Sequence, residues 1–377
     1  MKKDRRHFLR KIAAGGMASG LLPLSLGNGL PLATGNRSGG IRNPYISRDQ
    51  KTGPDPYQQN WMDLEFGMFI HFGINTYYDR EWSEGDLDIS VFDPGSLDTD
   101  QWCRVAKEAG MKYMVPVVKH HDGFCLWPTK YTDYSVSQTP FGKDLLGMLA
   151  DSASRHGLKM GIYYSLWDSH HTLHDTDENG YVEFVKNQME ELLTGYGELV
   201  QVWFDGFWKK QQSGWTHTDG THASPEEFIR AWRMEGAYRW QMDHLYQFIK
   251  AMQPGCMVMN NATSRYPGVP LHPVDATCGE KAFTETRYRK VWPWLGKDHY
   301  FPLEIEATMS VRGNDRFPKG NWFWHQWDHS VATVEQVRRW LELAGALDAN
   351  LLLNCGPMAN GRLRPGDVEV LTSLRDP

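Results

Sequence analysis

The sequence has few cysteines, and they are not arranged in pairs. The five residues, Cys103, Cys125, Cys256, Cys278 and Cys355, are odd in number and scattered, and no two of them form a Cys-x-x-Cys motif. Disulfide-held folds and zinc ribbons both need closely spaced cysteine pairs. We therefore expect this chain to be stabilised by a hydrophobic core and not by crosslinks.

Long hydrophobic runs and basic clusters are also scarce. The apolar run at residues 12–26 is too short and too rich in glycine to span a bilayer stably. The net charge of the 377 residues is -6, and no basic block follows the N-terminus, so nucleic acid is not an expected partner. No Gly-x-Gly-x-x-Gly motif follows the first expected strand, which argues against a dinucleotide-binding fold.

The N-terminus has the features of an export signal. Basic residues, including Arg5 and Arg6, precede the short apolar run, and a polar segment follows it. The arginine pair resembles a twin-arginine signal. We expect residues 1–30 to be a signal peptide and residues 31–56, rich in Gly, Pro, Asn and Ser, to be a linker. The mature protein is then expected to be periplasmic or secreted, with no membrane span.

Strand-like and helix-like stretches alternate through residues 57–377. Strands are expected at residues 66–73, 113–121, 159–165, 199–205, 256–260, 274–280, 302–306 and 349–354. Helices are expected at residues 99–109, 145–156, 181–195, 225–252 and 334–344. Regular alternation favours a parallel sheet, and eight strands predict an α/β fold of the (β/α)8 TIM-barrel type. A doubly wound open sheet is the alternative.

The expected strands end in polar side chains. In a (β/α)8 barrel the active site is built from the carboxyl ends of the strands. Here those ends carry His71, His120, His121, Tyr163, Asp205, Asn260, Asn261, Glu280, Glu304 and Glu306. Trp203 and Asp205 are two residues apart on one strand and leave it on the same side, so an indole lies beside a carboxylate. Sugar-binding sites use this pairing.

Two kinds of chemistry fit these residues. A metal-dependent hydrolase would use His71, one of the adjacent histidines and Asp205 as ligands. A glycosidase would use Asp205 as nucleophile and the histidines to bind sugar hydroxyls. Neighbouring residues of a strand point to opposite faces, so His120 and His121 can share the pocket only if the strand bulges. Several tryptophans in or near the loops after strands favour sugar: Trp82, Trp127, Trp203, Trp208 and Trp215.

An ordered set of motifs resembles glycoside hydrolase family 29, the α-L-fucosidases, over residues 58–366. The motifs are His71-Phe-Gly73, Glu81-Trp82, Lys119-His-His-Asp-Gly-Phe124, Trp127-Pro128, Tyr163-Tyr-Ser165, Trp203-Phe-Asp-Gly206 and Leu351-Leu-Leu-Asn-Cys-Gly-Pro357. The resemblance implies an exo-glycosidase that releases α-L-fucose from a fucosylated oligosaccharide or glycoconjugate, with retention through a covalent glycosyl-enzyme. It implies no metal and no organic cofactor.

The resemblance also implies roles for individual residues. Asp205 would be the nucleophile, and His71, His120 and His121 would bind the hydroxyls of fucose. Glu81 and Trp82 would lie nearby in the substrate-binding site, and Trp203 would help to shape the pocket for the methyl group on C5.

Glu280 is the candidate for the general acid/base. Asn260 and Asn261 follow the fifth strand, where relatives often place an acid, and amides cannot deliver a proton. The segment at residues 278–283 loosely resembles a Cys-Glu-Asp-Lys-Phe segment of animal family members. Glu304 and Glu306 are rivals that share one face of a strand, although they could instead form salt bridges with Arg287, Arg289 or Arg312.

Three departures from the family keep other readings open. The chain stops at Pro377, so we expect the C-terminal β-sandwich of many members to be absent; no acid follows the fifth strand; and residues 209–234 form an enlarged segment. A catalytically impaired, sugar-binding relative is therefore one alternative. An α-L-galactosidase is another, because an apolar pocket rejects an added hydroxyl only weakly. The oligomeric state is not predicted.

Overall fold

The computed structural model describes residues 53–206, 239–261, 273–281, 283, 290–294, 297–312 and 320–375. The expected signal peptide, most of the expected linker and the enlarged segment at residues 209–234 lie outside the described residues. So do Trp208, Trp215, Arg287 and Arg289. Among the helices within the described ranges, none combines the length and the hydrophobicity that crossing a membrane requires.

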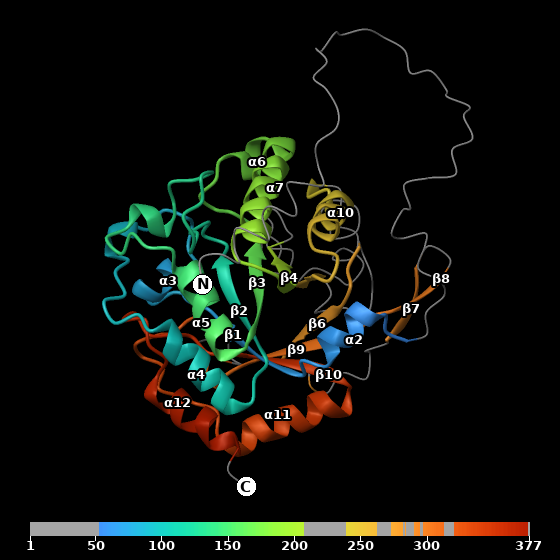
Figure 1. Cartoon of the computed structure of the whole chain (residues 1–377). Helices are drawn as coiled ribbons and strands as arrows, with labels where there is room; N and C mark the ends of the chain where they lie inside the picture. The colour runs from blue at the N-terminus through green and yellow to red at the C-terminus, as the bar shows by residue number, and fades with distance from the viewer. Residues whose placement is uncertain are drawn as a thin grey trace, which may run out of the picture. The chain divides into compact units, whose positions relative to one another are not determined.

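Eight parallel strands form a nearly closed barrel, which confirms the predicted fold class (Figure 1). Their bounds are β1 Phe66–Ile70, β2 Tyr113–Lys119, β3 Lys159–Ser165, β4 Leu199–Asp205, β5 Met257–Asn260, β6 Thr277–Glu280, β9 Leu303–Thr308 and β10 Ala349–Asn354. The hydrogen-bonded order is β5-β4-β3-β2-β1-β10-β9-β6. The first strand therefore pairs with the last, with Phe66 opposite Leu351 and Phe69 opposite Asn354.

The two ends of this order, β5 and β6, also approach each other. The Asp275 N–H donates to Val258 O at 2.7 Å, and the Cys278 thiol donates to Asn260 O at 3.2 Å. These bonds bring the carboxyl ends of β5 and β6 together, which matters because Asn261 and Glu280 lie there.

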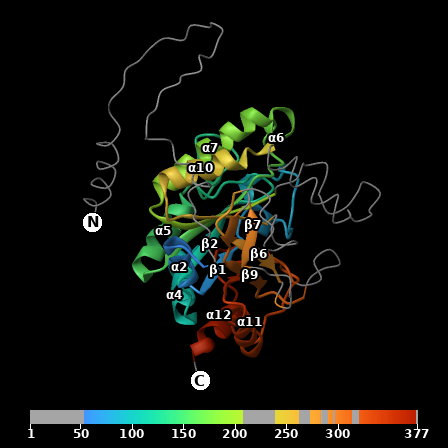
Figure 2. The same ribbon diagram turned by 90° about the vertical axis from the view of Figure 1, so that its right-hand side faces the viewer.

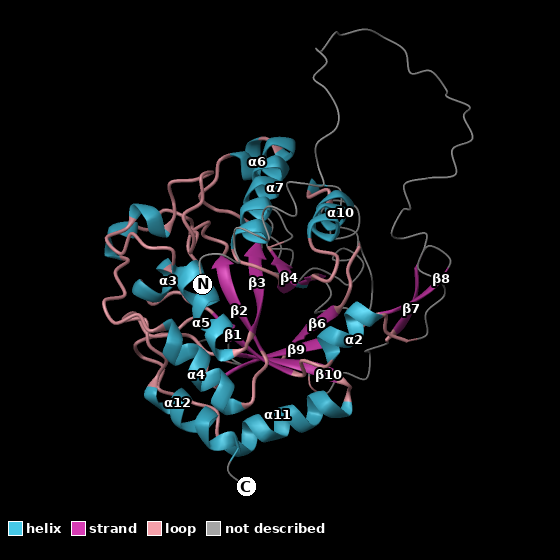
Figure 3. Cartoon of the chain, in the orientation of Figure 1, coloured by secondary structure: helices cyan, strands magenta, loops and turns pink. Residues whose placement is uncertain are grey.

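Helices surround the strands (Figures 2 and 3). Their bounds are α2 Pro56–Met62, α3 Ile74–Tyr77, α4 Thr99–Ala109, α5 Leu145–His156, α6 Leu173–Thr176, α7 Glu178–Gly195, α10 Met242–Met252, α11 Val334–Ala346 and α12 Pro365–Thr372. Short 3-10 turns also occur, at Ile89–Val91, Val136–Gln138 and Ser373–Arg375. One apolar cluster lies between the strands and these helices, and a second, which includes Phe69, Tyr163 and Trp203, fills the barrel interior.

Capping residues explain why two helices have the predicted bounds. Asp98 and Asp144 each accept a hydrogen bond from a backbone N–H of the first turn, in α4 and α5 respectively. Gly110 and Gly157 end these helices in the left-handed conformation, with φ of 91° and 68°. Both signals are local in sequence, which is why they could be read from it.

Elsewhere the predicted bounds were wrong. α10 begins at Met242 and is not the end of a continuous helix from residue 225, because Gln241 has a φ of 45° that a right-handed helix cannot contain. β2 ends at Lys119 rather than at residue 121. The antiparallel hairpin of β7 (Val291–Trp294) and β8 (Lys297–Tyr300) was not predicted.

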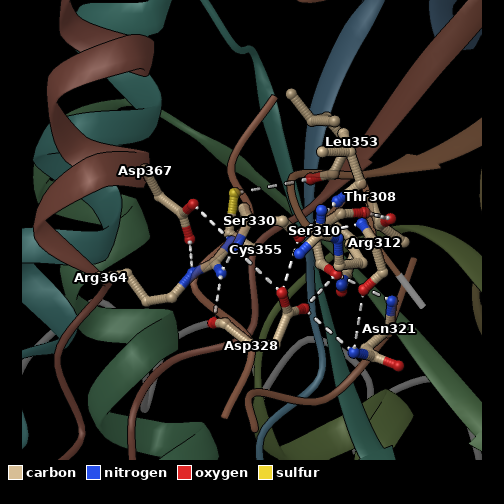
Figure 4. A network of polar contacts seen from close by, with 12 residues as sticks. Thr308, Ser310, Arg312, Asn321, Asp328, Ser330, Leu353, Cys355, Arg364 and Asp367 are labelled. Atoms are coloured by element: carbon tan, nitrogen blue, oxygen red, sulfur yellow. Dashed lines mark hydrogen bonds and ion pairs between the residues drawn. The ribbon is translucent and has the colours of Figure 1, made fainter. Parts of the chain in front are cut away.

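A polar network fixes the chain after β9 (Figure 4). The Arg364 guanidinium donates to both carboxylate oxygens of Asp367, at 2.9 and 2.7 Å, and to Ser330 O at 3.0 Å. Asp328 accepts from the Ser330 hydroxyl at 2.6 Å and from the Asn321 amide at 3.0 Å. The network ties α12 to residues 320–325, which we call the Trp322 loop and which reaches the site described next.

Candidate active site

Asp205 lies at the carboxyl end of β4, where its carboxylate is buried and held by three donors. Oδ2 accepts a hydrogen bond from the Tyr163 hydroxyl at 2.8 Å. Oδ1 accepts from the Gly206 N–H at 2.8 Å and from the Asn261 side-chain amide at 3.0 Å. Trp203 lies below it in the barrel interior, stacked on Tyr163 with ring centroids 5.3 Å apart. One strand thus supplies both the carboxylate and part of the floor beneath it.

A second carboxylate lies close to the first. Glu280, at the end of β6, accepts a hydrogen bond at Oε1 from Asn261 Nδ2 at 2.9 Å. The same nitrogen donates to Asp205 Oδ1 at 3.0 Å. The two carboxylate oxygens are therefore no more than about 6 Å apart, closer than the roughly 6.5–9.5 Å that separates the carboxyl groups of inverting glycosidases.

Both carboxyl groups hold their protons more tightly than usual. Burial, followed by the nearby Glu280 charge, raises the pKa of Asp205 to about 7. The pKa of Glu280 is also raised, because the surrounding protein shields its carboxylate from bulk water even though the side chain reaches the exposed rim. Because the charge on Glu280 contributes to the high pKa of Asp205, protonating Glu280 favours the ionised form of Asp205.

His71, just after β1, is a neutral imidazole of defined tautomer. Its Nδ1 lies 2.7 Å from Asn354 Oδ1, and the amide of Asn354 is oriented because its Nδ2 donates to Trp322 O at 2.7 Å. Nδ1 must therefore carry the hydrogen, and Nε2 is left as an acceptor. Burial lowers the pKa of His71 to about 3, so the ring is uncharged at neutral pH.

The adjacent histidines lie on the same side of the sheet because β2 is irregular at its end. The register with β3 shifts between Val117 and Lys119. As a result the rings of His120 and His121 are 4.2 Å apart, His120 is 5.8 Å from His71, and His121 Nε2 is 3.7 Å from Asp205 Oδ2. Both histidines also follow the last residue of β2, where the alternation of a strand no longer places neighbours on opposite faces.

His121 is also held in one tautomer. The Ser165 hydroxyl donates its hydrogen to Trp167 O at 2.7 Å, so its oxygen accepts from His121 Nδ1 at 2.7 Å. Nε2, which faces Asp205, is then unprotonated. Burial lowers the pKa of His121 to about 3, and burial with the neighbouring rings lowers that of His120. Neutral acceptor nitrogens of this kind suit sugar hydroxyls, which donate hydrogen bonds without carrying charge.

Lys119, which precedes the histidines, has a structural partner. Its fully buried ammonium lies 2.9 Å from Asp168 Oδ2 and 3.1 Å from the Tyr181 hydroxyl. Asp168 also accepts from the backbone N–H groups of His170 and His171. The ion pair therefore ties the end of β2 to the loop after β3, and it explains the lysine of the Lys-His-His motif.

The Trp322 loop forms one wall of the site, which the sequence analysis missed. The Trp322 ring lies 5.2 Å from His71, and the Phe323 ring lies 5.4 Å from His71 and 5.0 Å from His120. Glu81 holds this loop: its carboxylate accepts from the backbone N–H groups of Trp322 and Phe323 and from His325 Nε2 at 2.7 Å. No sequence motif marked the loop, since its contacts come from residues about 240 positions away.

The remaining predicted residues are placed as follows. Trp82 packs edge-on against His121 and Trp167, with ring centroids 5.5 and 5.8 Å away. Glu304 lies deeper in the barrel, where it accepts hydrogen bonds from the Tyr113 hydroxyl at 2.6 Å and from Gln201 at 3.1 Å.

Of the arginines considered as partners of the rival glutamates, Arg312 alone is described, and no ion pair joins it to Glu304 or Glu306. Glu306 is fully buried and accepts from the Gly279 N–H at 3.1 Å. Glu304 is fully buried too. Glu280 is the glutamate of the three that shares a donor with Asp205. Within the described ranges, no three His, Cys, Asp or Glu side chains are grouped so as to hold a metal ion.

A protein-family model described as Alpha-L-fucosidase matches residues 88–376 of the chain. Among curated proteins, the chain is 30% identical to alpha-L-fucosidase 1 of Arabidopsis thaliana over 336 residues, which cover 86% of this chain and 60% of that protein. It is 29% identical to a putative alpha-L-fucosidase 1 of Oryza sativa, with 86% and 58% covered. The chain thus spans about three fifths of the length of these plant relatives.

Solved structures show the same likeness. A glycoside hydrolase 29 family member from an unknown rumen bacterium superposes with a TM-score of 0.66 at 28% identity, over 85% of this chain and 56% of that one. Alpha-L-fucosidase isoenzyme 1 from Paenibacillus thiaminolyticus superposes with a TM-score of 0.65 at 28% identity, over 85% and 74%.

Proposed function

Because the chain belongs to the α-L-fucosidase family, glycoside hydrolase family 29, we propose that it releases α-L-fucose from fucosylated glycans with retention of configuration. The observation that supports this best is the pair of carboxylates, Asp205 and Glu280, bridged by one amide nitrogen. This short separation suits direct attack by a carboxylate, whereas inverting enzymes keep the two groups farther apart to admit a water molecule.

The proposed reaction has two steps. Asp205 attacks the anomeric carbon while Glu280 gives its proton to the departing glycosidic oxygen, which forms a covalent fucosyl-enzyme and frees the aglycone. Glu280, now ionised, then takes a proton from a water molecule whose oxygen attacks the same carbon. Fucose leaves, Asp205 is released, and Glu280 is protonated again.

The side chains around this pair suit a neutral, hydroxylated ring. His71, His120 and His121 are buried and uncharged, and two of them are held as acceptors at Nε2 by their partners on Nδ1. We assign them to the fucose hydroxyls, with Glu81, Trp82 and Trp203 completing the substrate-binding site. Fucosylated oligosaccharides or glycoconjugates are the proposed substrates.

A substrate screen tests this assignment. Purified protein is assayed on 4-nitrophenyl α-L-fucoside, 4-nitrophenyl α-L-galactoside and fucosylated oligosaccharides, with and without EDTA. We expect release of fucose that survives the chelator. Loss of activity with EDTA and recovery with zinc would replace the glycosidase mechanism by a metal-dependent one, and preference for the galactoside would change the assigned sugar. Binding of fucose without turnover of any substrate would identify a sugar-binding relative.

We also propose that the protein is exported, on the basis of the Arg5-Arg6 pair and the apolar run after it. Replacing both arginines by lysine keeps the charge and should leave the protein in the cytoplasm. The test is immunodetection in periplasmic and cytoplasmic fractions. Unchanged accumulation outside the cytoplasm would show that export does not depend on the arginine pair.

A further inference from the structure

Asn261 occupies the place between the two reactive carboxylates. Its amide nitrogen lies 3.0 Å from Asp205 Oδ1 and 2.9 Å from Glu280 Oε1. An amide nitrogen has two hydrogens, and both are used here. The opposite amide orientation would place an oxygen against both carboxylates, so the contacts themselves fix which end faces them. An acid at this position, as the resemblance to the family suggested, could not make both bonds when ionised.

We propose that Asn261 is a positioning residue that holds Asp205 and Glu280 at the separation needed for retaining hydrolysis by donating one hydrogen bond to each. This proposal rests on the proposed function. Asn261 does not touch the reacting atoms; it acts through the two carboxylates. It supplies the only contact between them that the described residues show.

The location of Asn261 fits this role. It follows β5 directly, at the point where β5 and β6 approach each other, and its side chain is nine-tenths buried. Glu280 is on β6 and Asp205 on β4, the two strands on either side of β5 in the barrel. A side chain at the end of β5 is therefore well placed to bridge them. The Asn261 amide nitrogen, with two hydrogens, can donate to both carboxylates.

The amide also counteracts the burial of the pair. Its hydrogen bonds lower the pKa of Asp205 and of Glu280, against burial, which raises both. Other charged or titratable groups face the same pair from the neighbouring elements: Tyr163 on β3, His121 after β2, Glu306 on β9 and Lys281 after β6. These groups are unchanged when Asn261 is replaced, so a shift in both carboxyl groups can be assigned to the amide.

Two substitutions separate positioning from simple space filling. Asn261→Asp keeps the shape of the side chain but replaces both donors by a third carboxylate, whereas Asn261→Ala removes the donors and volume without adding a charge. We expect each to lower kcat/KM on 4-nitrophenyl α-L-fucoside by at least about tenfold, the effect of losing a hydrogen bond to a charged group. We also expect both limbs of the pH profile to move to higher pH, by about one unit for Asn261→Ala and more for Asn261→Asp.

A matched control carries the same change elsewhere in the barrel. Asn350→Asp also replaces a buried asparagine, one that donates to Trp61 O at 2.9 Å on β10. It should leave both pH limbs in place. Circular dichroism reports whether each variant is folded. Folded Asn261 variants with wild-type pH limbs, whatever their rate, would overturn the proposal, because a residue that only fills space cannot move a pH limb.

A second measurement does not depend on turnover. Carbodiimide reacts with protonated carboxyl groups, so the pH at which labelling of the Glu280 peptide is half complete, read by mass spectrometry, reports the protonation of Glu280. This midpoint should rise in both Asn261 variants and stay unchanged in Asn350→Asp. If the wild-type protein hydrolyses no glycoside and the midpoint still rises, the proposed function fails, and only the effect of the Asn261 amide on the carboxyl pair stands. If hydrolysis is found and the midpoint does not move, the role of Asn261 fails alone.

Discussion

At the scale of single residues, Asp205 is the side chain on which the proposed reaction depends most. We predict that Asp205→Gly lowers kcat on 4-nitrophenyl α-L-fucoside by at least about a thousandfold, because no other described group can take over as nucleophile. The position ends a strand, so the change should not open a cavity in the core, and fucose should still bind. Steady-state kinetics and calorimetric titration with fucose measure the two effects.

Covalent labelling supplies the control for this substitution. A 2-fluoro-fucosyl fluoride should label the wild-type protein on the peptide that contains Asp205, and peptide mapping by mass spectrometry locates the adduct. Asp100→Asn, which alters an exposed carboxylate on α4, should be labelled as the wild type is. An adduct on any other carboxylate would assign the nucleophile elsewhere.

The role of Glu280 predicts a dependence on the leaving group. Glu280→Gln should impair natural fucosides far more than 4-nitrophenyl α-L-fucoside, because an activated phenolate leaves with little protonation. Azide should then accelerate the second step and yield β-fucosyl azide. Kinetics on both substrates and analysis of the product check this. Equal losses on both substrates, or none, would move the role to Glu304 or Glu306.

The residues that could be predicted from the sequence are those whose position depends on their own strand. His71, Asp205 and Glu280 are found where β1, β4 and β6 end, and the period of a strand placed Trp203 beside Asp205. The bridging role of Asn261 could not be predicted. It depends on how closely two other strands approach it, and no local pattern encodes that distance.

At the scale of elements, the Trp322 loop is held against the site by one side chain from a distant loop. We predict that Glu81→Ala raises KM and lowers the free energy of unfolding by about 2–4 kcal/mol, because buried backbone donors of Trp322 and Phe323 lose their acceptor. Kinetics and urea denaturation measure these changes. Glu84→Ala removes an exposed glutamate three residues away and should change neither. An unchanged KM in Glu81→Ala would separate this loop from substrate binding.

Element bounds could be predicted where the sequence carries its own stop signal. Asp98 with Gly110, and Asp144 with Gly157, define α4 and α5. The start of α10 was missed because the left-handed position is occupied by Gln241, and not by a glycine or proline that would indicate a helix boundary. The β7–β8 hairpin was missed because each strand has only four residues and β7 contains Pro293, a residue that is unfavourable inside a strand.

At the scale of the whole molecule, buried carboxyl groups make stability depend on pH. Burial raises the pKa of Glu304 to about 7, from 4.5. A carboxyl group whose pKa is higher in the folded state contributes stability below pH 4.5 that is lost as the pH rises through 7. We predict that the free energy of unfolding falls over this range and that Glu304→Gln reduces the fall by up to about 3 kcal/mol.

Urea denaturation between pH 4.5 and 8.5 tests the sign of this effect. Glutamine resembles the protonated acid. The free energy of unfolding of the Glu304→Gln variant should therefore increase relative to that of the wild type as the pH increases. Glu84→Gln, which alters an exposed glutamate, serves as the control and should follow the wild-type curve over this range. A wild-type protein that becomes more stable from pH 5 to pH 8 through Glu304 would contradict the burial of an uncharged acid in the barrel.

The pairing of the first strand with the last has a consequence for synthesis. β1 is made early, but one of its two neighbours is β10, whose residues follow almost 300 positions later. While the ribosome is still adding residues, β1 has an open edge, and the barrel can close only after Asn354 has emerged. Closure must therefore be a late, long-range event that precedes any export of the folded chain. A chain that is translocated while it is still being synthesised would therefore not form the complete barrel before export.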